Sequence, residues 1–156
     1  TCDGYVMHGD TPATIGSRIR DMKERRERKG LAPMQYGVAA YCIVRSSESE
    51  VRKEINRITD VRPGSPGYGN YQQWLAGTQL EQKVSLEDYS VSNRGLRSGL
   101  TGTPAEVEDR VREFEKAGVD FFLLQCSPQL EEMERFAEAL SLSRPSQQAR
   151  PFPAHQ

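Results

Sequence analysis

The side chains best suited to chemistry in this sequence are one histidine, one tyrosine and two arginines. His8 ends the first apolar run, where an imidazole that titrates near neutral pH suits proton transfer; the alternative is a turn histidine bonded to a backbone carbonyl. Tyr41 lies near the end of the longest apolar run, where its phenol can donate a hydrogen bond to a ligand oxygen; the alternative is a core tyrosine. Arg94 and Arg97 lie in a loop-like stretch and can hold a phosphate; the alternative is two solvated surface cations.

Three apolar runs, with helical patterns between them, predict the elements that position these side chains. The runs span residues 4–8, 36–44 and 119–125. The second run is almost continuously apolar, which is typical of a parallel strand buried on both faces. Strands that alternate with amphipathic helices form parallel βα units, and ligands bind at the carboxyl ends of such strands. This rule selects His8, residues 41–45 and residues 125–127.

Cap signals mark where the helices begin. Thr-Pro pairs at 11–12 and 103–104 each place a hydroxyl and then a proline at the start of a helical pattern. In both cases a glycine follows the helical pattern, and an apolar run comes after the glycine. Ser47 with Glu50 forms a capping box, and a last helix is expected to start at Ser127-Pro128 with Ser127 as its cap. Parallel βα units close as a doubly wound sheet or as an eight-stranded barrel of about 250 residues, of which this chain would supply roughly half.

Composition excludes several classes of protein. The chain has 156 residues, enough for one domain with a core and too few for two ordinary domains. Its 21 Lys and Arg against 22 Asp and Glu give a net charge of -1, which argues against a nucleic-acid-binding protein. No apolar run approaches the ~18 residues that cross a bilayer, so no membrane span is predicted.

The three cysteines and the first residue carry two more expectations. Cys2, Cys42 and Cys126 stand at irregular spacing with no Cys-x-x-Cys or His-Cys cluster, so we predict no metal site. We expect reduced thiols in a cytoplasmic protein. The chain opens on Thr1 and runs directly into an apolar segment, so we expect its natural start to lie upstream.

A change of amino-acid composition from Arg62 onward predicts a long insertion. Residues 62–98 are rich in Gly, Pro and polar side chains, and the stretch is too long for an ordinary connection in a compact domain. Such insertions act as lids or binding loops, or are disordered. The tail 144–156 lacks periodicity, and we expect it to be disordered.

Four segments of the sequence carry a family resemblance. They are YVMHGD at 5–10, YGVAAY at 36–41, SNRGLR at 92–97 and SPQLEEMERF at 127–136. Together they resemble the bacterial-luciferase-like flavin-dependent monooxygenases. The branch they are most similar to is the reduced-FMN-dependent dimethyl sulfone monooxygenases, and the alkanesulfonate monooxygenases are its neighbours.

The resemblance implies a fold, a cofactor and roles for the four side chains. It implies an α/β fold that is the C-terminal part of a (β/α)8 TIM barrel, over residues 1–143. It implies an oxidoreductase in which reduced FMN, supplied by a separate NAD(P)H-dependent flavin reductase, and O2 oxidise a small organosulfur compound. Tyr41 and His8 would then be catalytic, and Arg94 and Arg97 would hold the FMN phosphate when the insertion closes. We expect the complete enzyme to be a homo-oligomer.

The resemblance also bears on the substrate. Sulfonate-cleaving relatives show Arg and then His in the strand where this sequence has Ala39 and Tyr41. The loss of a cation fits an uncharged sulfone such as dimethyl sulfone better than a sulfonate anion, and alkanesulfonate stays the alternative. Relatives carry Tyr where Ser127 stands, so no catalytic role is assigned to Ser127. Two other classes remain open: a non-catalytic barrel fragment that pairs with another chain, and a flavin-binding module without turnover.

Overall fold

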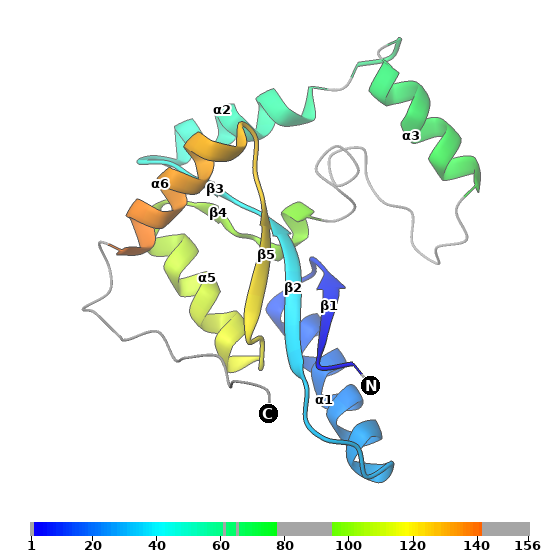
Figure 1. The fold of residues 1–156 in the computed structure, drawn as a ribbon. Helices are drawn as coiled ribbons and strands as arrows, with labels where there is room; N and C mark the ends of the chain where they lie inside the picture. Colours follow the sequence, from blue (N-terminus) through cyan, green and yellow to red (C-terminus); the bar gives the residue numbers. More distant parts are fainter. Residues whose placement is uncertain (1, 61, 65, 78–94, 142–156) are drawn as a thin grey trace.

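The structure, a computed structural model, describes residues 2–60, 62–64, 66–77 and 95–141 (Figure 1). Strands and helices alternate along most of this length. In chain order the elements are β1 Gly4–His8, α1 Pro12–Arg28, β2 Gln35–Tyr41, β3 Ile43–Val44, α2 Glu48–Thr59, α3 Pro66–Gly77, the 3-10 helix η1 Gly95–Ser98, β4 Thr101–Gly102, α5 Pro104–Lys116, β5 Phe121–Gln125 and α6 Gln129–Ser141.

The main sheet has three parallel strands in the order β1-β2-β5, which confirms the predicted parallel arrangement. Along β1 and β2 the register places His8 opposite Ala39, and along β2 and β5 it places Tyr41 opposite Gln125. The central strand β2 is buried over most of its length, as its continuous apolar sequence predicts. A second, parallel pair joins β3 to β4.

The apolar run 36–44, predicted as one strand, is two strands with a change of partner between them. The Cys42 N–H still donates to the Gln125 carbonyl beside β5 at 2.9 Å, whereas the Ile43 N–H donates to the Leu100 carbonyl before β4 at 3.0 Å. The strand at 119–125 begins two residues later than predicted, because the Val119 N–H bonds the Phe114 carbonyl at the end of α5.

The helix starts confirm three of the four cap signals. The Thr14 N–H donates to the Thr11 hydroxyl at 3.4 Å, and the Glu50 N–H donates to the Ser47 hydroxyl at the same distance. Thr103 begins α5 with a complete capping box. The prediction that Ser127 caps the last helix is wrong.

That helix, α6, begins two residues after Ser127. Its first backbone bond runs from the Glu132 N–H to the Pro128 carbonyl at 3.2 Å, which makes Pro128 the last residue before the helix. Ser127 therefore lies outside the capping position.

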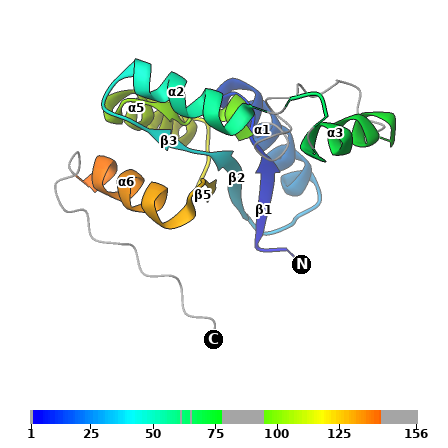
Figure 2. The same ribbon diagram turned by 90° about the horizontal axis from the view of Figure 1, so that it is seen from above.

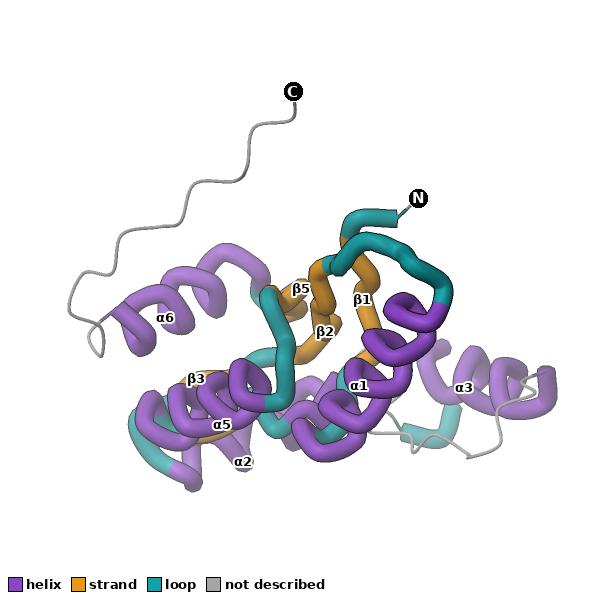
Figure 3. Tube along the Cα trace, turned by 90° about the horizontal axis from the view of Figure 1, so that it is seen from below, coloured by secondary structure: helices purple, strands orange, loops and turns teal. Residues whose placement is uncertain are grey.

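The core lies between the sheet and its helices. Helices α1 and α5 pack side by side against one face of the sheet, and α6 packs against β3 and α5 (Figures 2 and 3). The rings of Phe114 and Phe122 meet edge to face at 5.4 Å between centroids. The buried cluster comprises Met7, Ile15, Ile19, Tyr36, Val38, Ala40, Cys42, Val44, Leu100, Val107, Phe114, Val119 and Ala139.

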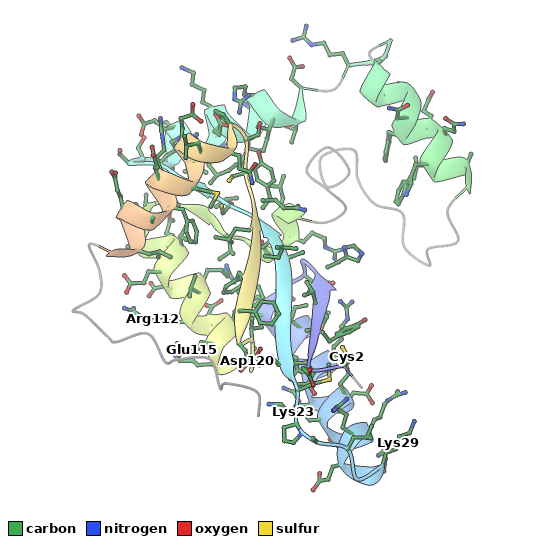
Figure 4. The ribbon with its side chains drawn as sticks, viewed as in Figure 1. Cys2, Lys23, Lys29, Arg112, Glu115 and Asp120 are labelled. Carbon is green, nitrogen blue, oxygen red and sulfur yellow. The ribbon has the colours of Figure 1, made fainter. Side chains whose placement is uncertain are left out.

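At the amino-terminal end of the sheet, Asp120 ties β5 to β2. The Tyr36 N–H donates to the Asp120 carboxylate at 2.8 Å, and the Asp120 N–H donates to the Tyr36 carbonyl at 2.8 Å. Asp120 lies at the start of β5, far from the carboxyl end of the sheet where α2 lies (Figure 4). This pair fixes the register of the two central strands.

The opposite side of the sheet, which we call the open face, is the side that α1 and α5 leave uncovered. By strand alternation and register it carries Val6, His8, Gly37, Ala39, Tyr41, Phe121, Leu123 and Gln125. Val6 is 44% exposed and Leu123 is 55% exposed. The Phe121 ring occupies the space that a Cβ on Gly37 would need, so this close contact depends on glycine.

The predicted insertion contains regular structure in its described part. Within it the structure describes α3, which lies away from the sheet and from the other helices (Figure 1). Residues 78–94 and 142–156 lie outside the described part of the chain. The limits predicted for the insertion and the tail therefore stay predictions.

Candidate active site

His8 and Tyr41 lie on the open face at the carboxyl ends of adjacent strands. His8 ends β1 opposite Ala39, and Tyr41 follows two residues later on β2. With parallel strands ~4.8 Å apart and a rise of ~3.3 Å per residue, this offset separates their Cα positions by about 8 Å. The His8 side chain is exposed and Tyr41 is buried. A ligand of modest size can contact both.

Tyr41 is enclosed by the elements that follow the sheet. Its ring belongs to a cluster with Ile43, together with Ile55 and Ile58 of α2 and Leu96 of η1. Burial raises the pKa of the Tyr41 phenol, and the negative charge of Glu54 raises it further. The phenol therefore stays protonated at neutral pH, as a hydrogen-bond donor must.

Four charged side chains form an ion network at the carboxyl end of the sheet. Arg45, which follows β3, donates two hydrogen bonds to Glu132 of α6, at 2.7 and 2.8 Å. Its guanidinium also lies 3.4 Å from the carboxylate of Glu54 on α2. Arg57, one turn further along α2, pairs with Glu54 at 2.6 Å. The network joins three segments that are far apart in sequence.

Sequence reasoning missed this network, apart from its central cation. Residues 41–45 were selected as a strand end, which includes Arg45, but no partner was assigned to it. The Arg45–Glu132 pair spans 87 positions along the chain. The one sequence signal was local: Glu54 and Arg57 stand three residues apart on an amphipathic helix, the spacing of an intrahelical ion pair.

Arg97 lies at the same edge of the sheet, held by an aspartate. Its guanidinium is 4.0 Å from the carboxylate of Asp10, the residue two positions beyond His8. Arg18 of α1 approaches the same carboxylate at 3.3 Å. Asp10 is buried, and the Thr11 N–H donates to it at 2.9 Å. Arg94, the other expected phosphate ligand, lies outside the described residues.

Two thiols lie behind the candidate site. Cys42 follows Tyr41 in the buried core, and Cys126 follows β5. Burial, then the neighbouring Cys126 thiol, raises the pKa of Cys42 to about 12. Among the described residues no group of three or more His, Cys, Asp or Glu side chains could hold a metal ion. The described helices include none long and apolar enough to span a bilayer.

A groove of about 480 Å³ lies elsewhere, between α2 and the start of α5. Its lining comprises Glu48, Val51, Arg52, Ile55, Asn56, Thr101, Gly102 and Glu106. None of the predicted site residues contributes to it. We therefore place the candidate site on the open face and not in this groove.

Three solved structures have a similar fold. Long-chain alkane monooxygenase (LadA) aligns with a TM-score of 0.62 and 19% identity, covering 90% of this chain and 36% of that protein. Riboflavin lyase (RcaE), solved with modified FMN and riboflavin, aligns with a TM-score of 0.60 and 17% identity, over 90% and 38%. EDTA monooxygenase (EmoA) from Chelativorans sp. BNC1 aligns with a TM-score of 0.59 and 12% identity, over 90% and 41%. The chain thus spans less than half the length of each.

At these identities the structural likeness establishes the fold, which confirms the predicted C-terminal part of a (β/α)8 barrel. The sequence itself gives the family. The sequence model of the luciferase-like monooxygenase family matches residues 1–120, which is more than half of the chain. This matched region includes α2 and the three elements β1, β2 and η1, which bring His8, Tyr41 and Arg97 to one edge of the sheet. The chain therefore belongs to the luciferase-like monooxygenase family.

Proposed function

We propose that this chain is part of a flavin-dependent monooxygenase that uses reduced FMN and O2 to oxidise a small organosulfur compound such as dimethyl sulfone. One observation carries the proposal. In a chain of this family, His8 and Tyr41 lie on the open face at the carboxyl ends of adjacent parallel strands. Ligands bind at that end of the strands in barrel enzymes.

The residues present fit a flavin. Val6, Ala39 and Leu123 offer an apolar, partly exposed surface to a planar ring. Arg97 offers a partly exposed guanidinium to a phosphate, for which it would exchange its 4.0 Å contact with Asp10. Arg94 is proposed as a second phosphate ligand. When bound, reduced FMN supplies the electrons that activate O2.

The side chains of the chain itself would orient the substrate and move a proton. Tyr41, neutral and fixed by packing, would donate a hydrogen bond to a sulfonyl oxygen. His8, exposed at the end of β1, would exchange a proton with the reacting groups.

The charge balance supports an uncharged substrate. The four members of the ion network beside Tyr41, two guanidinium groups and two carboxylates, cancel in formal charge, and the further cation at Glu132, Arg135, is 55% exposed and 3.9 Å away. Ala39 adds no cation on the open face. A sulfone needs no counter-ion, whereas an alkanesulfonate, the alternative substrate, does.

We also propose that a separate NAD(P)H-dependent reductase supplies the reduced FMN and that the complete enzyme is a homo-oligomer. We propose the cytoplasm as its location, which the three free thiols support.

Single-turnover reaction of the complete enzyme with reduced FMN and 18O2 tests the proposal. The products formed from dimethyl sulfone should carry 18O, and methanesulfonate should give no labelled product. Tyr41→Phe should lower turnover by about 10²-fold, the usual cost of losing one donor to a reacting oxygen, with reduced-FMN affinity unchanged. Tyr5→Phe, on the exposed end of β1, is the matched control. Unchanged turnover in Tyr41→Phe would remove Tyr41 from the mechanism, and labelled product from methanesulfonate alone would favour the sulfonate alternative.

The exposed open face favours one further candidate, a barrel part that functions by pairing with another chain. Val6, Phe121 and Leu123 are large apolar side chains in contact with solvent. Light scattering of the chain with and without Leu123→Glu separates the cases. Association that the glutamate abolishes supports pairing through this face, and a monomer in both supports a free ligand-binding face. FMN binding without O2 consumption would indicate a flavin-binding module without turnover.

A further inference from the structure

One turn of α2 lies directly against the buried Tyr41 ring. Ile55 and Ile58 pack against the buried cluster that Tyr41 forms with Ile43. Glu54 and Arg57 are their immediate neighbours on the same turn, so α2 brings two opposite charges to the tyrosine along with its apolar contacts.

Arg57 connects this turn to the chain after β5. Its Nε and Nη2 donate to both oxygens of Glu54, at 2.6 to 3.1 Å. The same Nη2 donates to the backbone carbonyl of Ser127 at 2.8 Å, across 70 positions of sequence. Arg57 thereby links α2 to the turn that leads into α6, and Tyr41 lies opposite the end of β5 that precedes this turn.

The titratable groups that act on Tyr41 come from two helices and from the residue after β5. They are Glu54 and Arg57 of α2, Cys126 after β5, and Glu132 of α6. Glu54, Cys126 and Glu132 raise the pKa of the phenol, and Arg57 lowers it. The interaction is mutual, since Tyr41 in turn raises the pKa of Arg57.

Hydrogen bonding at Glu54 explains why the cation matters. A carboxylate whose oxygens are engaged by Arg57 is a poor competitor for the phenol proton. Without Arg57, Glu54 would keep only Arg45, at 3.4 Å, and its less compensated negative charge would hold the phenol proton more strongly. The phenol would then be a weaker donor to a ligand.

We propose that Arg57 is a positioning residue for Tyr41: it holds α2 and the β5–α6 turn together beside the phenol, and it engages Glu54 so that the Tyr41 hydroxyl donates to a ligand. The importance of Tyr41 to a reaction rests on the proposed function. The effect of Arg57 on Tyr41 is a property of this chain and can be measured without a flavin.

A pH titration of the chain labelled with 13Cζ-tyrosine tests the proposal by NMR, with the Tyr41 resonance assigned from Tyr41→Phe. Arg57→Gln should raise the Tyr41 midpoint on the order of half a pH unit, because a nearby positive charge is lost. Glu54→Gln should lower it by a similar amount. Arg57→Lys keeps a cation only below the ordinary lysine pKa of about 10.4, and the Tyr41 pKa is raised above 10, so its midpoint should fall between those of wild type and Arg57→Gln. The matched control is Arg52→Gln, which removes an exposed charge of the same helix that lines the groove beside α5 and is not among the groups that shift the Tyr41 pKa.

Circular dichroism at each pH confines the comparison to folded protein. A Tyr41 midpoint in Arg57→Gln equal to that in Arg52→Gln would overturn the proposal, as would a fall. If Arg57→Gln does not fold, Arg57→Lys and Glu54→Gln decide: a Glu54→Gln midpoint no lower than wild type would also overturn it. If the proposed function is wrong, a different result is expected: Tyr41→Phe would keep its turnover, while the shifts of the Tyr41 midpoint would still appear.

Discussion

Replacing Arg45 with methionine removes the central cation of the ion network. The Arg45 side chain is 10% exposed and Glu132 is 6% exposed, so their two hydrogen bonds lie away from water. Without Arg45, Glu132 keeps one cation nearby, Arg135 at 3.9 Å. Removing one partner of a buried pair costs about 3–5 kcal/mol, because the other charge stays desolvated. We expect Arg45→Met to destabilise the chain by about this amount.

Removing the carboxylate of the pair should destabilise the fold less than removing the cation. In Glu132→Gln, Arg45 keeps Glu54 at 3.4 Å and the Val44 carbonyl at 2.8 Å, so its charge stays compensated. The expected cost is that of one charged hydrogen bond, about 1.5–3 kcal/mol. The double variant Arg45→Met with Glu132→Leu leaves neither charge buried and unpaired, so its cost should be below the sum of the two single changes.

Urea unfolding followed by circular dichroism at neutral pH measures these differences. The matched control is Arg112→Met on α5, whose guanidinium is 56% exposed and pairs with Asp109 at 3.1 Å (Figure 4). An exposed pair contributes about 0.2–1 kcal/mol. If Arg45→Met costs no more than Arg112→Met, the network does not stabilise the fold and the reasoning from burial is refuted.

Three further changes test local features. Gly37→Ala should lower stability by about 1–3 kcal/mol because its Cβ meets the Phe121 ring, and Phe121→Leu added to it should restore much of the loss in the same urea assay. Glu54→Gln should be destabilising at neutral pH. Hydrogen bonds from Arg57 hold the pKa of Glu54 in the folded protein below its ordinary 4.5. The ionised Glu54 therefore stabilises the fold above pH 4.5, and this stabilisation is lost as the pH falls through the lowered pKa. The melting temperatures of wild type and Glu54→Gln should differ at neutral pH and converge at low pH. Iodoacetamide should modify Cys126 well before Cys42, whose pKa of about 12 and burial protect it, and equal rates by intact mass would contradict this.

The sequence predicts those parts of the fold that depend on residues close together along the chain. Thr11 and Thr103 cap their helices as their hydroxyls and following prolines indicate. The glycine that follows the first helical pattern, Gly30, has φ 62°, a conformation that favours glycine. By contrast, the break at Cys42 depends on which strand supplies the next hydrogen-bond partner, and no periodicity within the run 36–44 encodes that choice.

The candidate site divides in the same way. Strand ends predict His8 and Tyr41, since an apolar run must stop where its strand stops. Asp10 and Arg57 escape prediction because their partners, Arg97 and the Ser127 carbonyl, lie far along the chain. Whether a surface-type side chain finds a distant partner depends on tertiary packing, which single-sequence patterns do not contain.

Burial separates the polar and the apolar halves of this site. Among the described residues, no buried side-chain nitrogen or oxygen lacks a hydrogen-bond partner, and the charges beside Tyr41 are paired within the chain. The apolar half is different, since Val6 and Leu123 remain largely in water. Burying such a side chain completely is worth about 1.5–3 kcal/mol, so whatever covers the open face gains free energy from contacts that the chain has not used internally. The polar groups can therefore set the orientation of a ligand, while the apolar surface contributes to how tightly it is held.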